Sequence, residues 1–206
     1  MKEIILSVWI EIIAAFTGVL SVWFAKKENI LVYPIGLISV GLYVLICFFA
    51  KLYADAFINL YYFIISIFGW YYWMYGRKFQ SSELDTTEKK AVIIRSSFKE
   101  NIILIFLTLL LFVGLGFLLQ NFTDSNVPWA DAFNTSIFII AMYLMAKKNI
   151  YHWIFWIVGD LASIPLYIYK NLNVTAFQYL IFLLIAIAGY IEWRKKLNAQ
   201  VHDAST

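Results

Sequence analysis

The sequence predicts an all-α membrane protein with seven transmembrane helices in a 3+1+3 parallel-repeat arrangement. Three observations lead to this prediction: long apolar runs, Lys and Arg residues gathered on alternate connections, and segments that match at a spacing of 120 residues. Hydrophobic residues make up 63% of the chain and charged residues 14%, against about 45–50% and about 25% in soluble domains. So much apolar surface requires contact with lipid. Because the runs are continuous and do not alternate as barrel strands do, we expect helices, which satisfy their own backbone hydrogen bonds.

Seven apolar runs predict the helices in chain order. Crossing about 30 Å of hydrocarbon takes roughly 20 helical residues. The runs cover residues 4–25, 30–50, 54–76, 100–120, 129–146, 150–169 and 173–193. The first run is longer than the apolar core of a signal peptide and has no clear small-residue cleavage site, so we expect it to span. The polar stretch 77–99 predicts a long connection, and the residues after Lys196 predict a disordered tail.

The distribution of positive charge predicts the orientation. If all seven runs cross the membrane, 13 of the 16 Lys and Arg residues fall on one side. These are Lys26, Lys27, Arg77, Lys78, Lys89, Lys90, Arg95, Lys99, Lys147, Lys148, Arg194, Lys195 and Lys196. Only Lys2, Lys51 and Lys170 fall on the other side. Since Lys and Arg favour cytoplasmic connections, we expect the N-terminus outside and the C-terminus in the cytoplasm.

An internal match divides the seven helices into two similar halves. At a spacing of 120 residues, Ala56, Phe57, Leu60, Gly69 and Trp73 meet Ala176, Phe177, Leu180, Gly189 and Trp193. Upstream, Ala25-Lys26-Lys27 meets Ala146-Lys147-Lys148, and with an insertion Gly36, Ser39 and Tyr43 meet Gly159, Ser163 and Tyr167. We therefore predict a single transmembrane domain over residues 1–206, with repeats at 4–76 and 129–193 joined by a connecting helix at 100–120. Because one helix inverts the chain between them, the halves have the same orientation, a known transporter plan with its substrate site near the midplane.

The sixth run carries the clearest candidate for a substrate site. A polar and aromatic stripe of Asn149, Trp153, Trp156, Asp160, Ser163 and Tyr167 follows spacings of 4, 3, 4, 3 and 4, which is one face of a helix. An acid within a span usually faces a polar cavity. Two flat indole faces beside an acid suit an aromatic, cationic ligand. The alternatives are that the tryptophans are interfacial anchors and that Asp160 pairs with a neighbouring helix.

Three further residues are candidates for the same site. Asn59 and Tyr62 lie one turn apart on the third run, and Gln178 occupies a comparable position on the seventh. Polar side chains within spans also form hydrogen bonds between helices. Lining the site and holding helices together are therefore both open for these residues.

The sequence offers no metal site, cofactor site or catalytic motif. The single cysteine, Cys47, cannot form an intramolecular disulfide, and His152 and His202 have no second Cys or His at a metal-ligand spacing. Zinc-protease, nucleophile-elbow and phosphate-loop motifs are absent. We predict no catalytic residue, no metal and no cofactor, which argues against a membrane-embedded enzyme. The 77–99 connection is too short for a signalling domain, which argues against a sensor.

Four sequence elements together resemble the PnuC family of vitamin transporters over roughly residues 5–195. They are Trp-x-x-Trp at 153–156, the Gly-Asp-x-x-Ser-x-Pro-x-Tyr that follows it, Asp-x-x-x-Asn-x-x-Tyr at 55–62 and Gly-Trp-x-x-Trp at 69–73. The resemblance implies a fold like a full-length version of the SWEET sugar transporters, a homotrimer and a place in the bacterial cytoplasmic (inner) membrane. By the same resemblance, Trp153 and Trp156 hold an aromatic ring and Asp160 contacts a polar group one turn away.

The resemblance also implies the cargo and the mode of transport. Family members take up nicotinamide riboside, a precursor of NAD, by facilitated diffusion, and a cytoplasmic kinase then traps the substrate by phosphorylation. Relatives handle thiamine or riboflavin. Because Asp160 also suits the aminopyrimidine or thiazolium of thiamine, thiamine or another flat vitamin is the alternative cargo.

Overall fold

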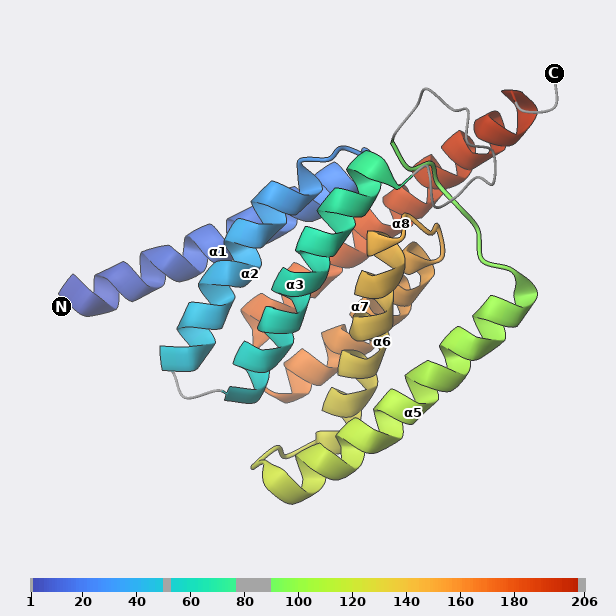
Figure 1. Cartoon of the computed structure of the whole chain (residues 1–206). Coiled ribbons are helices and arrows are strands. Elements are labelled where there is room, and N and C mark those ends of the chain that lie inside the picture. The colour runs from blue at the N-terminus through green and yellow to red at the C-terminus, as the bar shows by residue number, and fades with distance from the viewer. Residues whose placement is uncertain (1, 50–52, 77–89, 204–206) are drawn as a thin grey trace. The chain divides into compact units, whose positions relative to one another are not determined.

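The computed structural model describes residues 2–49, 53–76 and 90–203, and these residues are almost entirely helical. Seven helices follow one another, and no strand is found in these ranges beyond one isolated bridge between Ile94 and Asn149. The helices are α1 (Lys2–Lys26), α2 (Val32–Phe49), α3 (Tyr53–Tyr75), α5 (Phe98–Phe122), α6 (Pro128–Ala146), α7 (His152–Tyr169) and α8 (Asn173–Asp203) (Figure 1). The predicted all-α class and the number of helices are confirmed.

The predicted helix boundaries agree with the structure to within a few residues, except at the C-terminal end. There α8 continues to Asp203, so the prediction of a disordered tail after Lys196 is wrong. The run of Trp193, Arg194, Lys195, Lys196 and Leu197 contains good helix formers and no Gly or Pro, so nothing in it ends the helix. Most of the predicted polar connection, residues 77–89, lies outside the described residues.

Four helical stretches are long and apolar enough to cross a membrane, judged by length and composition of the described residues. They are Val32–Phe49, Phe98–Phe122, Pro128–Ala146 and Asn173–Gln200, and a shorter apolar helix covers Ile12–Lys26. The helices α3 and α7, which carry most of the predicted site residues, are not among the four, because polar side chains lower their hydropathy. The chain is a multi-pass membrane protein.

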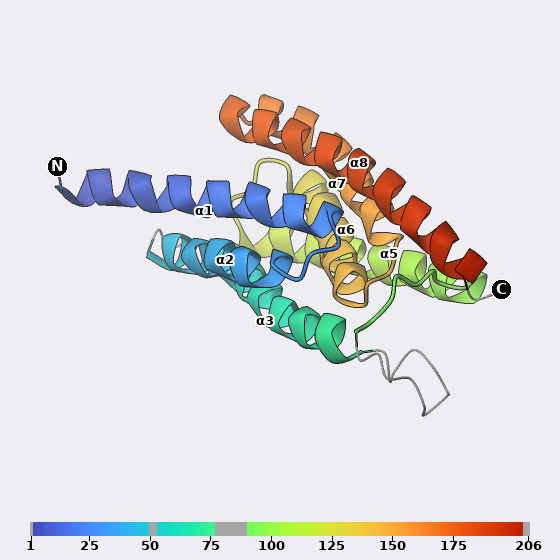
Figure 2. The same cartoon turned by 90° about the horizontal axis from the view of Figure 1, so that it is seen from above.

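Two compact units divide the chain, and the first contains α1, α2 and α3. It comprises residues up to Val92 together with Ala146–Lys148. Within it α2 contacts both α1 and α3, and the three helices lie side by side in both views (Figures 1 and 2). The Tyr33 ring packs edge-on against Trp73 at 5.2 Å between centroids. The absence of a side chain at Gly69 makes room for this ring, because a Cβ there would lie 2.5 Å from the Tyr33 hydroxyl.

The second unit contains α5, most of α6, α7 and α8. Buried Leu104, Ile140 and Leu144 form a hydrophobic cluster between α5 and α6. Trp129 at the start of α6 packs over Gly116 of α5, and its Nε1 donates a hydrogen bond to Gln120 Oε1 at 2.9 Å. The helices α7 and α8 pack against each other. This packing fixes the orientation of the face of α7 that carries the predicted site.

The turns that follow α1 and α6 have the same local structure at a spacing of 120 residues. Glu28 and Lys148 adopt the left-handed backbone conformation, with φ of 59° and 57°, which non-glycine residues seldom adopt. One residue later, Asn29 Oδ1 accepts a hydrogen bond from Leu31 N at 2.9 Å, and Asn149 Oδ1 accepts one from Tyr151 N at 3.0 Å. The sequence match of Ala25-Lys26-Lys27 with Ala146-Lys147-Lys148 is therefore shifted by one residue relative to the match between the two backbone turns.

The helix contacts that follow these turns match at the same spacing. Tyr33 packs against Gly69 and Trp73, and Trp153 packs against Gly189 and Trp193. The Trp153–Trp193 pair is also edge-on, at 5.8 Å and 85°. No insertion is needed between the turn and these contacts, unlike in the sequence match of Gly36, Ser39 and Tyr43.

Candidate substrate site

Trp153, the first tryptophan of the predicted stripe, is packed inside unit 2. Only 1% of its surface is exposed, and its ring lies against His152, Trp193 and Gly189. A Cβ on Gly189 would lie 2.6 Å from Trp153 Cη2, so the glycine is what allows the indole to fit between α7 and α8. In this arrangement the two faces of the Trp153 ring are taken up by protein, and Trp153 fixes the contact between the two helices.

Trp156, one turn further along α7, has a different environment. It is half-buried, and its ring lies 5.2 Å from that of Phe138 on α6, at an interplanar angle of 31°. Phe138 also stacks on Tyr179 of α8, and Tyr179 stacks on Tyr167 at 5.0 Å and 12°. The absence of a side chain at Gly159 makes room for Phe138, since a Cβ on Gly159 would overlap the phenyl ring. Three helices therefore contribute to one cluster of nearly parallel aromatic rings, and Trp156 lies at its edge.

Asp160 lies one turn beyond Trp156 and is 2% exposed. No hydrogen bond or ion pair of its carboxyl group is found within the described part of the chain. A buried carboxylate without a countercharge is costly. Its isolation argues against the alternative that Asp160 pairs with a neighbouring helix for structural reasons, and it favours a site that receives a cation.

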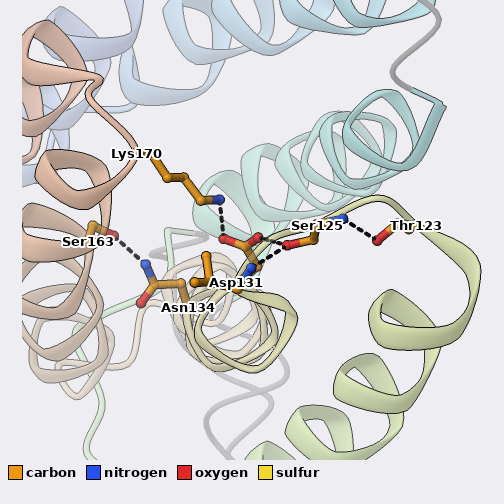
Figure 3. Close-up of polar contacts among 7 residues, drawn as sticks. Thr123, Ser125, Asp131, Asn134, Ser163 and Lys170 are labelled. Carbon is orange, nitrogen blue, oxygen red and sulfur yellow. Dashed lines mark hydrogen bonds and ion pairs between the residues drawn. The ribbon is translucent and has the colours of Figure 1, made fainter.

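Beyond Asp160, the stripe continues into a buried polar pair. Asn134 Nδ2 on α6 donates a hydrogen bond to Ser163 Oγ on α7 at 2.9 Å (Figure 3). Asn134 is 6% exposed and Ser163 is fully buried. Sequence reasoning missed Asn134 and Phe138 because α6 carries no continuous polar stripe. The spacing of four between them, which places both on one face, is the only signal that was available.

The remaining predicted site residues lie on α3 and α8. Gln178 is partly exposed in the second turn of α8, one residue before Tyr179 of the aromatic cluster. Asn59 and Tyr62 lie on α3 in unit 1, where the Tyr62 ring contacts that of Tyr61. Among the described residues no group of three or more His, Cys, Asp or Glu side chains is placed to hold a metal ion.

An ion pair joins the end of α7 to the start of α6 in unit 2. Lys170, directly after α7, lies 2.6 Å from Asp131 Oδ1 in the first turn of α6 (Figure 3). Ser125 Oγ donates a second hydrogen bond to the same carboxylate at 2.7 Å. The Lys170 ammonium also lies 6.0 Å from the ring of Tyr167. Asp131, unlike Asp160, therefore has its charge balanced by protein.

The site thus combines an aromatic surface, a buried acid that has no countercharge among the described residues, and a buried amide. An aromatic surface of this kind favours a flat ring, and the acid favours a positive charge on that ring. The amide offers a directional hydrogen bond close to both. This combination can bind and orient a small planar cation, and it contains no nucleophile aligned with a base.

Comparison with known proteins identifies the family of this chain. Residues 8–195 match the model of a family described as nicotinamide mononucleotide transporter. The nicotinamide riboside transporter PnuC of Escherichia coli K12 is 26% identical over 202 residues, which cover 90% of this chain and 84% of that protein. PnuC of Neisseria mucosa is 27% identical over 197 residues, covering 91% and 72%. The riboflavin/roseoflavin transporter RibM of Streptomyces davaonensis is 21% identical over 187 residues, covering 90% and 84%.

The fold is likewise that of a solved transporter. A crystal structure of the vitamin B3 transporter PnuC superposes with a TM-score of 0.70 and 27% identity, covering 91% of this chain and 81% of that one. The resemblance predicted from the motifs in α3 and α7 is confirmed. Since the family model matches nearly the whole chain, the protein belongs to the nicotinamide mononucleotide transporter family.

Proposed function

We propose that this protein takes up nicotinamide riboside across the membrane. The observation that carries the proposal is the position of Trp156 and Phe138, two rings in contact, one turn from the buried Asp160. Nicotinamide riboside is a flat pyridinium cation. Its ring would stack at the edge of the aromatic cluster, and its positive charge would balance the carboxylate. The names of the relatives in Escherichia coli and Neisseria mucosa support the same cargo.

The other predicted site residues have different roles in this proposal. Trp153 holds α7 against α8, so that Trp156 and Asp160 keep their spacing, and it comes into contact with the ring of the substrate when these helices part. Gln178, beside the aromatic cluster, offers hydrogen bonds to the hydroxyl groups of the riboside. Asn59 and Tyr62 stay proposed substrate-binding residues of α3.

The matched turns and ring contacts support a 3+1+3 architecture as part of the proposal. In it α1–α3 and α6–α8 are two copies of one three-helix repeat, and α5 is the connecting helix. The charge distribution then places the N-terminus outside and the C-terminus in the cytoplasm of the bacterial inner membrane. The broad apolar surface of α5, which exposes Phe106, Leu110 and Phe117 among others, is compatible with a homotrimer.

Replacing Trp156 with alanine tests the stacking surface. We expect Trp156→Ala to weaken binding of nicotinamide riboside by roughly tenfold to a hundredfold, because a stacked aromatic or cation–π contact contributes about 1–2 kcal/mol and apolar burial adds to it. The measurement is a binding titration of the purified protein. Trp9→Ala is the matched control, since Trp9 is 59% exposed on α1. Equal affinities of wild type and Trp156→Ala would show that Trp156 does not bind the substrate.

Transport of a cation by facilitated diffusion predicts uptake that depends only on the concentration gradient of the substrate and on the membrane potential. The chain has no phosphate-binding motif, and a single acid that pairs with the substrate's own charge leaves no need for a coupling ion. In proteoliposomes held at zero membrane potential, we expect inward and outward fluxes to be equal, without any effect of sodium or proton gradients. Accumulation above the outside concentration at zero potential would show that an ion drives transport. In the cell, a cytoplasmic kinase would trap the substrate, because phosphorylation adds negative charge that the site cannot balance.

Thiamine is the second candidate cargo, and Asp160 is the observation that favours it. The thiazolium ring of thiamine is also a flat cation, whereas the isoalloxazine ring of riboflavin is neutral. A titration of the purified protein against all three vitamins separates them. We expect nicotinamide riboside to bind most tightly and riboflavin least tightly.

A further inference from the structure

The side-chain amide of Asn134 is buried, and only one of its two polar atoms has a hydrogen-bond partner among the described residues. Its Nδ2 donates to Ser163 Oγ at 2.9 Å, whereas its Oδ1 is buried and has no hydrogen-bond partner among the described residues. Buried polar atoms are nearly always paired, and an unpaired one costs about 1–3 kcal/mol. A partner for Oδ1 is therefore expected from outside the protein, and a ligand in the adjacent site would provide one.

The position of Asn134 connects it to the proposed substrate site. Asn134 lies one turn from Phe138 on the same face of α6, and the Phe138 ring contacts Trp156. Its partner Ser163 lies one turn from Asp160 on α7. Residues three or four apart on a helix have their Cβ atoms about 5–6 Å from each other. Asn134 Oδ1 therefore lies within about one helical turn of both the acid, Asp160, and the aromatic cluster.

We propose that Asn134 Oδ1 accepts an N–H hydrogen bond from the carboxamide of the substrate ring, and that Asn134 makes the site reject the corresponding ring carboxylate. This inference rests on the proposed function. A ring carboxylate has no N–H to donate, and its negative charge would face both the amide oxygen and Asp160. Ser163 determines the direction of the contact, because it holds the amide nitrogen and leaves the oxygen toward the ligand.

The test compares two ribosides that differ only at this group. Nicotinamide riboside and nicotinic acid riboside are titrated against purified wild-type protein, Asn134→Ala and Ser163→Ala. Wild type is expected to bind the amide at least tenfold more tightly than the acid, from the lost hydrogen bond and the oxygen left unpaired. In Asn134→Ala the amide should lose roughly tenfold in affinity while the acid changes little, so that the preference falls by roughly tenfold. Any preference that remains reflects the repulsion between the ring carboxylate and Asp160.

Each outcome of the titration has a definite meaning. A ribose hydroxyl offers the same donor chemistry as the carboxamide, but both ribosides contain it. An equal loss for both in Asn134→Ala would therefore assign Asn134 to the ribose and overturn the proposal, as would an unchanged preference. Binding of neither riboside by wild type would refute the proposed function as well, whereas tight binding of the amide with unaltered selectivity refutes this inference alone.

Two further variants guard against indirect effects. Ser163→Ala leaves Asn134 in place but removes the group that orients it, so we expect a partial loss of preference, and this variant decides the question if Asn134→Ala does not fold. Asn121→Ala is the matched control. Asn121 lies on α5 and donates only to the backbone oxygen of Phe117 at 2.7 Å, so its removal should leave both affinities unchanged.

Discussion

Replacement of Asp160 by asparagine is expected to lower the affinity for nicotinamide riboside by about a hundredfold. Asp160 is 2% exposed, and its carboxyl group has no ion pair within the described part of the chain. In our proposal the pyridinium ring supplies the missing positive charge. Removing one partner of a buried charge pair typically costs about 2–5 kcal/mol, and about 2.7 kcal/mol corresponds to a hundredfold change in the dissociation constant. Asparagine keeps the size of the side chain, so the change isolates the charge.

An uncharged analogue of the substrate provides the matching control. In reduced nicotinamide riboside the ring carries the same carboxamide and ribose without the positive charge. We expect Asp160→Asn to change the affinity for this analogue by less than about threefold, so that most of the preference for the oxidised form is lost. Asp131→Asn is the control substitution, because Asp131 already pairs with Lys170 and exposed or half-exposed pairs contribute only about 0–1 kcal/mol. Equal losses for both forms of the riboside would mean that Asp160 has a structural role.

Most of the fold could be predicted from the sequence because lipid imposes simple requirements on it. A span must be apolar over roughly 20 residues, so seven runs of such residues give seven helices with boundaries close to those found. The end of α8 escaped prediction because a helix that leaves the membrane no longer needs apolar residues, and its polarity resembles that of a disordered tail. The predicted alignment of the two turns was shifted by one residue. Ala-Lys-Lys recurs at both turns, whereas the residues in the left-handed conformation, Glu28 and Lys148, differ in chemistry.

The candidate site was only partly predictable, for a related reason. The face of α7 with Trp156 and Asp160 follows from helical spacing alone, since all its members lie on one element. The environments of the two tryptophans do not follow from it, because they depend on Gly189 of α8 for Trp153 and on Phe138 of α6 for Trp156. Asn134 is one of several polar residues on α6, and only its burial and its contact with Ser163 distinguish it from a solvated side chain.

The second large effect is expected at the turns, where Lys148→Met should lower the free energy of unfolding by about 2–4 kcal/mol. Lys148 is 6% exposed, and its ammonium group contacts Glu28, Ala91 and Trp73 in unit 1. Its Nζ lies 2.8 Å from Glu28 Oε1, donates to the Ala91 carbonyl at 2.6 Å and lies 5.0 Å from the ring of Trp73. Breaking a buried ion pair by removing one partner costs about 3–5 kcal/mol, and the partial exposure of Glu28 reduces this loss. The measurement is thermal unfolding of the purified protein in detergent.

Two variants separate the ion pair from the other contacts. In Lys148→Met/Glu28→Gln no unbalanced carboxylate is left, so about half of the lost stability should return. Lys147→Met is the matched control, because the Lys147 ammonium only lies over the rings of Phe68 and Tyr72, at 5.4 and 4.9 Å, and such contacts contribute about 0.5–1 kcal/mol at exposed sites. If the double variant were no more stable than Lys148→Met, the hydrogen bond to Ala91 would be the main contribution of the lysine.

The ion pair also explains why the two turns share a backbone conformation but not a residue. Glu28 and Lys148 occupy the same left-handed position in the turns after α1 and α6, a position where glycine or asparagine would be less strained. A glycine in either turn would remove the strain together with one of the two charges. We therefore expect that Lys148→Gly still destabilises the protein, by about 1 kcal/mol less than Lys148→Met does, because the lost ion pair outweighs the conformational gain.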